Sequence, residues 1–278
     1  MINTLHQLEE SKPVRHILIA DDLGTIEYSI EGMLNKHPAV TSGRLTFETA
    51  QVTNPNDIPA TVELAWDMGV TYDLALVDLD FGSRRAGGSQ SHGLTALRLL
   101  AEATPHTTTA LYTADVEGNR ELMLRAAFEL SPHKPSTWIS KSLEPPRQAE
   151  AICDLLDGRD PPLGAHLRPY YNRPEHLKLH TVCGTRTQLR LWQALALGLE
   201  NRVQIAAQAG ASPSTLDKFV AHARAFILDC MPPHASPEGA RAAAIPAARS
   251  ANLALAVRFA YTNRAFFDDP ELEQFVVR

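Results

Sequence analysis

The sequence predicts an α/β doubly wound parallel five-stranded sheet in its first half and an all-α domain in its second half. Apolar, β-branched runs alternate five times with amphipathic stretches before residue 158. Residues 158–176 are then dense in proline and lack periodicity, which is typical of a linker. The charge also changes: residues 1–160 hold 23 acidic and 13 basic side chains, whereas residues 161–231 hold 4 and 8.

The elements of the first half follow from local pattern. Strands are expected where apolar or alternating runs occur, over residues 16–20, 44–52, 73–78, 107–114 and 136–140. Helices are expected where apolar residues recur at helical spacing, over residues 25–37, 57–69, 92–103, 117–130 and 146–158. Five successive βα units predict one parallel sheet, whose working site lies beyond the carboxyl ends of its strands.

The second half predicts helices only. One helix carries an apolar stripe at Leu189, Trp192 and Leu195. Ser212 can cap a later helix that has Pro213 at its first position. Residues 247–267 are expected to form one more helix, apolar over much of its surface, which must bury more than one stripe. We expect this helix to pack either on the first half or across the two-fold axis of a homodimer.

The composition also limits where the protein works. No apolar run approaches the roughly 20 residues of a membrane helix, and the N-terminus lacks the features of a secretion signal. Three cysteines lie far apart without metal-ligand spacing, so we expect buried, reduced thiols. A cytoplasmic protein without membrane partners is therefore expected.

Polar side chains end the predicted strands. Asp21 and Asp22 follow the first strand, Asp78 the third, Thr113 the fourth and Lys141 the fifth. In a parallel sheet these side chains converge on one edge, where three carboxylates repel one another and favour a bound cation. All-oxygen ligands with an open position suit Mg²⁺, and a lysine and a hydroxyl suit phosphoryl oxygens. The implied chemistry is phosphoryl transfer to an aspartate nucleophile.

Four motifs in order, HILIADDLGT, DLALVDLDFG, ALYTAD and WISKS, resemble the receiver domain of two-component response regulators over residues 13–158. The resemblance implies a phosphoacceptor at Asp78 and a sensor histidine kinase or phosphotransfer protein as partner. It also implies the following roles: Asp21, Asp22, Asp78 and the Asp80 carbonyl for Mg²⁺, Thr113 and Lys141 for phosphoryl oxygens, and Trp138 as an aromatic switch residue. The chain departs from the family in its longer loop at residues 82–91 and in Ser142, where the family prefers proline.

Residues 185–230 resemble the helix-turn-helix of the LuxR/FixJ class of regulators, after a linker at 159–184 and before a helical extension at 231–278. The resemblance implies a recognition helix from Pro213 onward, double-stranded DNA as a partner and a homodimer. The candidate DNA contacts are Ser214, Thr215, Lys218, His222 and Arg224. Asp217 stands where this class often has a basic residue, and a negative charge there opposes phosphate binding.

Two other functions fit parts of these patterns. The helical half can instead bind a protein partner, or form a packing module that no longer binds DNA. An acyl-phosphate hydrolase on a similar sheet would also use an aspartate nucleophile, but the second half offers no substrate-pocket motif. The sequence therefore favours a phosphorylation-switched transcription regulator rather than an enzyme.

Overall fold

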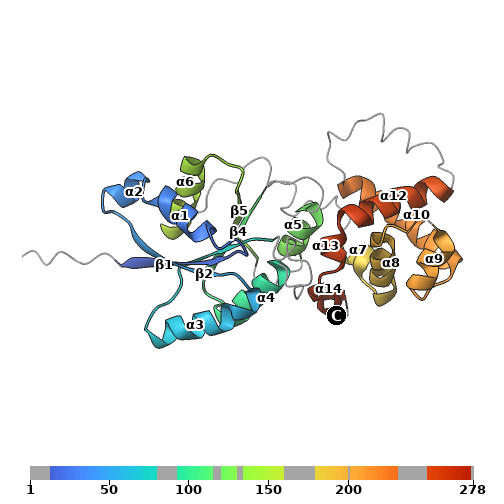
Figure 1. Cartoon of the computed structure of the whole chain (residues 1–278), viewed down its shortest axis with the longest axis horizontal. Helices are drawn as coiled ribbons and strands as arrows, with labels where there is room; N and C mark the ends of the chain where they lie inside the picture. Colours follow the sequence, from blue (N-terminus) through green and yellow to red (C-terminus); the bar gives the residue numbers. More distant parts are fainter. Residues whose placement is uncertain are drawn as a thin grey trace, which may run out of the picture.

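The computed structural model describes residues 13–79, 93–114, 120–129, 134–159, 179–199, 201–230 and 249–276. An α/β part and an all-helical part lie next to each other along the longest axis (Figure 1). The strands are β1 (Val14–Ala20), β2 (Thr46–Val52), β3 (Leu74–Val77), β4 (Thr108–Thr113) and β5 (Thr137–Ser140).

The five strands form one sheet in the order β2-β1-β3-β4-β5, and every neighbouring pair is parallel. This is the doubly wound, flavodoxin-like order, in which the switch point lies between β1 and β3. The central strand β3 is buried along its whole length, as its uninterrupted apolar sequence predicts. The predicted α/β fold class is confirmed.

Helices cover both faces of the sheet. They are α1 (Ile26–Leu34), α2 (Pro38–Thr41), the 3₁₀ helix η1 (Pro55–Asp57), α3 (Ile58–Asp67), α4 (Gly93–Ala103), α5 (Arg120–Glu129) and α6 (Pro145–Leu156). Helices α1 and α6 pack on one face, and α3 and α4 lie on the other (Figure 1). The alternation of side chains along each strand supplies one apolar layer to each face.

The helical part contains α7 (Leu179–Cys183), α8 (Arg186–Ala196), α9 (Arg202–Gln208), α10 (Pro213–Cys230), α12 (Arg249–Thr262), α13 (Arg264–Phe267) and α14 (Glu271–Val276). Its helices begin at side chains that satisfy free backbone amides. Thr185 and Gln188 form a capping box on α8, and Asn201 accepts two amides of α9. Ser212 Oγ accepts the Thr215 amide at 3.1 Å, so the predicted cap is present.

One aromatic cluster holds this part together. Trp192 is fully buried and stacks on Phe267, with ring centroids 4.8 Å apart. Phe219 and Phe259 approach the same indole at 5.1 and 5.6 Å. Rings from α8, α10, α12 and α13 therefore share one core, and each pair adds roughly 0.5–1.5 kcal/mol beyond its buried area.

The expectation of one continuous helix over residues 247–267 is wrong. Helix α12 ends at Thr262, and Asn263 donates its side-chain amide to the Phe259 carbonyl at 2.8 Å. A side chain that bonds its own backbone competes with helix propagation, which accounts for the break. Helix α12 packs on α8 and α10, a packing within the helical part that was not expected. The expected packing across the two-fold axis of a homodimer remains a prediction. Tyr261, in the last turn of α12, is 51% exposed.

The two parts meet through a continuous interface. Arg125 of α5 is 4% exposed and reaches Asp229 at 3.3 Å and Cys230 Sγ at 3.0 Å, both in the last turn of α10. Arg98 of α4 bonds the buried Glu271 of α14 at 2.9 Å. The apolar core on this face of the sheet continues into the helical part, so the two parts pack as partners.

Two further expectations concern the whole chain. Cys153, Cys183 and Cys230 are buried thiols outside any disulfide, as expected. Among the described residues, no helix has both the length and the apolar character that crossing a membrane requires.

Candidate functional site

Three carboxylates meet at the carboxyl edge of the sheet. Asp21 and Asp22 follow β1, and Asp78 follows β3, the strand beside it. One carboxylate oxygen from each lies within 4.8 Å of the others. Asp21 and Asp78 are buried, with 1% and 6% exposure, whereas Asp22 is half-buried. The convergence expected from the strand ends is therefore present, at the point where strand order switches.

Lys141 joins two of these carboxylates. Its Nζ lies 2.5 Å from Asp21 Oδ2 and 2.5 Å from Asp78 Oδ2. Burial by itself lowers the pKa of Lys141, but the charges of Asp78 and Asp21 outweigh it and the net direction is upward. Burial raises the pKa of Asp21; Lys141 opposes that shift and Asp78 adds to it. The lysine thus stays charged and offsets repulsion between two buried carboxylates.

The turn that carries Asp21 and Asp22 is held by Gln51, a residue that the sequence patterns do not single out. Its Nε2 donates to the carbonyls of Asp21 at 3.0 Å and Leu23 at 2.8 Å. Its Oε1 accepts the Glu27 amide at the start of α1, at 3.2 Å. Gln51 lies near the end of β2, the neighbour of β1 in the sheet, and this adjacency was the only signal that could have identified it.

The turn that carries Lys141 is held in a similar way by Gln148 of α6. Its Nε2 donates to the carbonyls of Lys141 at 3.2 Å and Leu143 at 2.6 Å. Its Oε1 accepts the hydroxyl of Tyr112 at 2.5 Å. The Tyr112 ring lies 5.5 Å from Lys141 Nζ in cation–π geometry. Sequence reasoning missed both residues.

Thr113 and Trp138 lie next to the site on β4 and β5. Thr113 is buried at the end of β4, and its carbonyl accepts the Lys141 amide at 3.0 Å. Trp138 is buried, and its Nε1 lies 3.4 Å from the same carbonyl. The expected roles of Thr113 as a phosphoryl contact and of Trp138 as a switch remain predictions. Asp80 lies outside the described residues, so its expected metal contact remains a prediction as well.

The donor set fits the expected metal. Asp21, Asp22 and Asp78 offer oxygen atoms only, at a spacing that one ion can bridge. Hard divalent cations such as Mg²⁺ prefer carboxylate and water oxygens. Lys141 now offsets the negative charge of the buried Asp21 and Asp78. A bound cation would offset the same charge in place of the Lys141 contacts.

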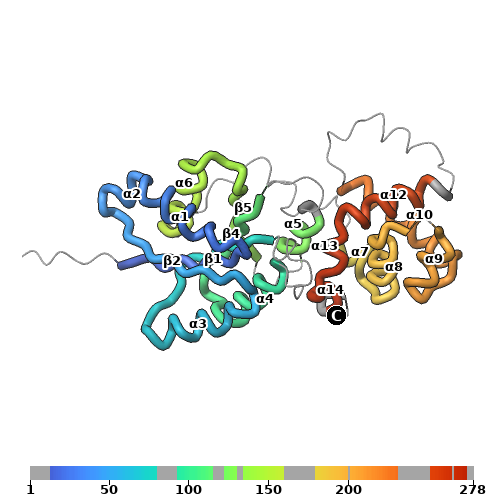
Figure 2. The backbone as a smooth tube through the Cα atoms, in the orientation of Figure 1, coloured from blue at the N-terminus to red at the C-terminus, as the bar shows by residue number. Residues whose placement is uncertain are grey.

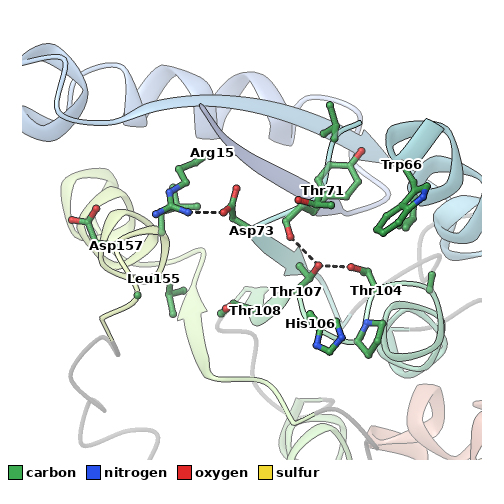
Figure 3. A pocket seen from close by; sticks show the side chains of 17 residues that line it. Arg15, Trp66, Thr71, Asp73, Thr104, His106, Thr107, Thr108, Leu155 and Asp157 are labelled. Atoms are coloured by element: carbon green, nitrogen blue, oxygen red, sulfur yellow. Dashed lines mark hydrogen bonds and ion pairs between the residues drawn. The ribbon is translucent and has the colours of Figure 1, made fainter. Parts of the chain in front are cut away.

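The opposite edge of the sheet carries a pocket of about 530 Å³. Figure 3 shows Arg15 and Asp73 pointing toward each other across its floor, and Trp66 and His106 farther along its lining. Arg15 and Asp73 form an ion pair at 2.7 Å, and the Thr107 hydroxyl donates to the Tyr72 carbonyl. These polar groups satisfy one another, in contrast to the crowded carboxylates at the other edge.

The candidate DNA-binding residues lie on α10. Ser214, Thr215, Lys218 and His222 are exposed, and Arg224 is half-buried. One ring nitrogen of His222 lies 3.4 Å from the Thr181 carbonyl. Helix α9 lies at the end of the molecule far from the sheet, so the α/β part does not cover this region (Figure 2).

The unfavourable charge at Asp217 has a partner. Arg202 of α9 lies 3.2 Å from Asp217 Oδ2. The pair is partly exposed, so it contributes little stability, but it reduces the negative potential on this face. The ion pair also engages Arg202, a basic residue that could otherwise contact phosphate. This surface therefore carries both positive and negative side chains.

No protein-family model matches the chain, and no curated protein matches it. Solved structures that match include response regulators and receiver domains. A CheY-like receiver domain from Methanospirillum hungatei JF-1 is 18% identical, with a TM-score of 0.38, over 52% of this chain and 96% of that one.

Structures of RcsB match across both parts, and two of them are as follows. RcsB from Salmonella enterica serovar Typhimurium bound to promoter P1flhDC is 13% identical, with a TM-score of 0.43, over 78% of this chain and 92% of that one. A Salmonella typhimurium RcsB variant is 14% identical, with a TM-score of 0.46, over 77% and 91%.

Proposed function

We propose that this chain is a response regulator that accepts a phosphoryl group on Asp78 and acts through DNA binding by its helical part. The observation that carries the proposal is the carboxylate cluster spanned by Lys141. Asp78 follows β3, beside the strand that Asp21 and Asp22 follow, and Lys141 bonds both Asp21 and Asp78. A buried nucleophile between a cation site and an ammonium is arranged for electrostatic stabilisation of phosphoryl transfer.

The chemical step is a simple transfer. A carboxylate oxygen of Asp78 attacks phosphorus, a new O–P bond forms, and the donor's bond to phosphorus breaks. The leaving group departs with its electron pair, as acetate from acetyl phosphate or as imidazole from a phosphohistidine. The product is an acyl phosphate, which water later hydrolyses to restore the carboxylate.

The residues around Asp78 would bind the metal ion and contact the phosphoryl oxygens. Asp21, Asp22 and Asp78 would hold Mg²⁺, which supplies positive charge to the transferring phosphoryl oxygens when bound. Lys141 exchanges its carboxylate contacts for a phosphoryl oxygen. Its raised pKa keeps it cationic at neutral pH. Thr113, at the end of the neighbouring strand β4, would donate its hydroxyl to another oxygen.

The output proposed for the helical part is binding of double-stranded DNA by a homodimer. Support comes from the capped α9–α10 pair, joined through residues 209–212, and from the exposed Ser214, Thr215 and Lys218 at the start of α10. Two recognition helices in a dimer would meet half-sites about one helical turn apart. A sensor histidine kinase or phosphotransfer protein is the proposed phosphoryl donor.

The test is direct labelling with acetyl [³²P]phosphate and Mg²⁺. Wild-type protein should become labelled with an acid-stable, alkali-labile linkage, and Asp78→Asn should not, because an amide is not a comparable nucleophile. Asp73→Asn serves as the matched control, since Asp73 is an aspartate at the opposite edge of the sheet. Equal labelling of wild type and Asp78→Asn would refute Asp78 as acceptor.

A second candidate output is a protein partner. The mixed surface favours it: Arg202 and Asp217 pair with each other, and Val203 beside them is 59% exposed. Salt dependence separates the two outputs. DNA binding through phosphates weakens steeply between about 50 and 200 mM salt, whereas binding through an apolar contact does not. Gel shifts against genomic fragments near the gene, with and without acetyl phosphate, measure DNA binding directly.

A further inference from the structure

We infer that Tyr112 and Gln148 are positioning residues that fix the Lys141 ammonium between Asp21 and Asp78. The inference rests on the proposed function, since it concerns how Lys141 is placed for phosphoryl transfer. Tyr112 lies on β4 and Gln148 on α6, and the two side chains meet behind the turn that follows β5. Both act through Lys141 rather than on the transferring group.

Gln148 fixes the backbone of the turn that begins at Lys141. The residue is 6% exposed, and its side-chain amide donates to the carbonyls of Lys141 and Leu143. The turn has no proline to restrict its backbone, because Ser142 follows Lys141. Ser142 donates its amide to Ser140 Oγ at 3.1 Å instead. Side-chain hydrogen bonds therefore hold this turn to α6.

Tyr112 fixes the far end of the lysine side chain. Its ring is 4% exposed and lies 5.5 Å from Lys141 Nζ. The hydroxyl donates to Gln148 Oε1 at 2.5 Å, so the ring cannot rotate away without breaking that bond. Burial, with the charges of Asp21 and Asp78, raises the pKa of Tyr112 to about 12. The hydroxyl therefore keeps its proton and remains a donor.

The two contacts act together on one flexible side chain. A lysine has a four-carbon stem with many rotamers, so its ammonium is poorly placed unless the backbone and the stem are both restrained. Gln148 restrains the backbone, and the Tyr112 ring limits where the ammonium can lie. A displacement of about 1 Å at a reacting centre can cost up to about a hundredfold in rate. The Tyr112–Gln148 pair is therefore expected to affect rate rather than metal binding.

The test compares Gln148→Leu, Tyr112→Phe and Tyr112→Leu with Gln193→Leu as a matched control. Gln193 also donates its side-chain amide to a carbonyl, that of Phe267, but in the helical part. Three quantities are measured on the full chain: the rate of labelling by acetyl phosphate, the Mg²⁺ dissociation constant by calorimetry, and the Lys141 ¹³Cε resonance in lysine-labelled protein. The resonance is assigned with Lys141→Arg.

Gln148→Leu and Tyr112→Leu should lower the labelling rate at least about tenfold, with wild-type Mg²⁺ affinity. Tyr112→Phe keeps the ring and should lose only about threefold. The Lys141 resonance should shift in Tyr112→Leu and broaden in Gln148→Leu, and stay near its wild-type position in Tyr112→Phe. Gln193→Leu should change none of these.

Three results would overturn the inference. One is an unchanged Lys141 resonance in both Gln148→Leu and Tyr112→Leu. Another is wild-type labelling in those variants. The third is a rate loss matched by an equal loss of Mg²⁺ affinity, which indicates general damage to the site. If wild-type protein takes no label at all, the proposed function fails, and the Lys141 resonance alone decides whether the positioning is real.

Discussion

Replacing Arg125 should loosen the contact between the two parts of the chain. The guanidinium is 4% exposed and reaches Asp229, Glu129 and the Cys230 sulfur within 3.3 Å. It also lies 5.1 Å from the centre of the Phe226 ring. Truncating one partner of a fully buried ion pair costs about 3–5 kcal/mol. Because the Asp229 and Glu129 side chains keep 26% and 20% exposure, water can solvate them, and we expect the lower end, about 3 kcal/mol.

Urea unfolding followed by circular dichroism and by tryptophan fluorescence measures this loss. The wild type should unfold with coincident transitions, and Arg125→Ala should lose about 3 kcal/mol and unfold its two parts at different urea concentrations. Arg125→Met keeps the stem and should lose less. The matched control is Arg159→Ala, which removes an exposed arginine from two surface ion pairs and should cost less than about 1 kcal/mol. Equal effects of Arg125→Ala and Arg159→Ala, with coincident transitions in both, would refute this account of the interface.

Other measurements test other parts of the molecule. Burial raises the pKa of Asp269 from 3.8 to about 7 in the folded state. A raised folded pKa contributes stability that is fully present below the unfolded value of 3.8 and is lost as pH rises to about 7, so Asp269→Asn should flatten the fall in melting temperature between about pH 4 and 7; an unchanged slope contradicts this. Trp138 emission should change on adding Mg²⁺ with beryllofluoride, and a signal that persists in Trp138→Phe would assign the change elsewhere. Lys218→Ala should weaken DNA binding and reduce the salt slope by about 0.9, whereas Lys36→Ala, a surface lysine on the other part, should not.

Local pattern was sufficient for the sheet and for the acidic residues of its site. Four of the five strands are apolar runs followed by a polar residue, and parallel pairing then places Asp21, Asp78 and Lys141 together without further information. The same reasoning located the cap at Ser212, because capping depends on residues within one turn.

The supporting residues could not be predicted in this way. Tyr112 and Gln148 are 36 residues apart, and Gln51 bonds a carbonyl 30 residues away, so no local pattern relates them. The break at Asn263 was missed because apolar periodicity continues through it. The packing of α12 was missed because it depends on the aromatic rings of three other helices around Trp192.

Because α10 is long, a tilt at its contact with Arg125 moves the other end of the helix. The helix has 18 residues, and at about 1.5 Å per residue it spans about 27 Å. Its last turn is anchored to α5 by Arg125, while Ser214 and Lys218 lie near its other end. A rigid rod held at one end amplifies motion: a tilt of about 10° at the anchor moves the far end by about 5 Å, close to one helical turn. Small movements of α5 that leave the sheet intact could therefore change the position and orientation of the N-terminal end of α10, where Ser214 and Lys218 lie.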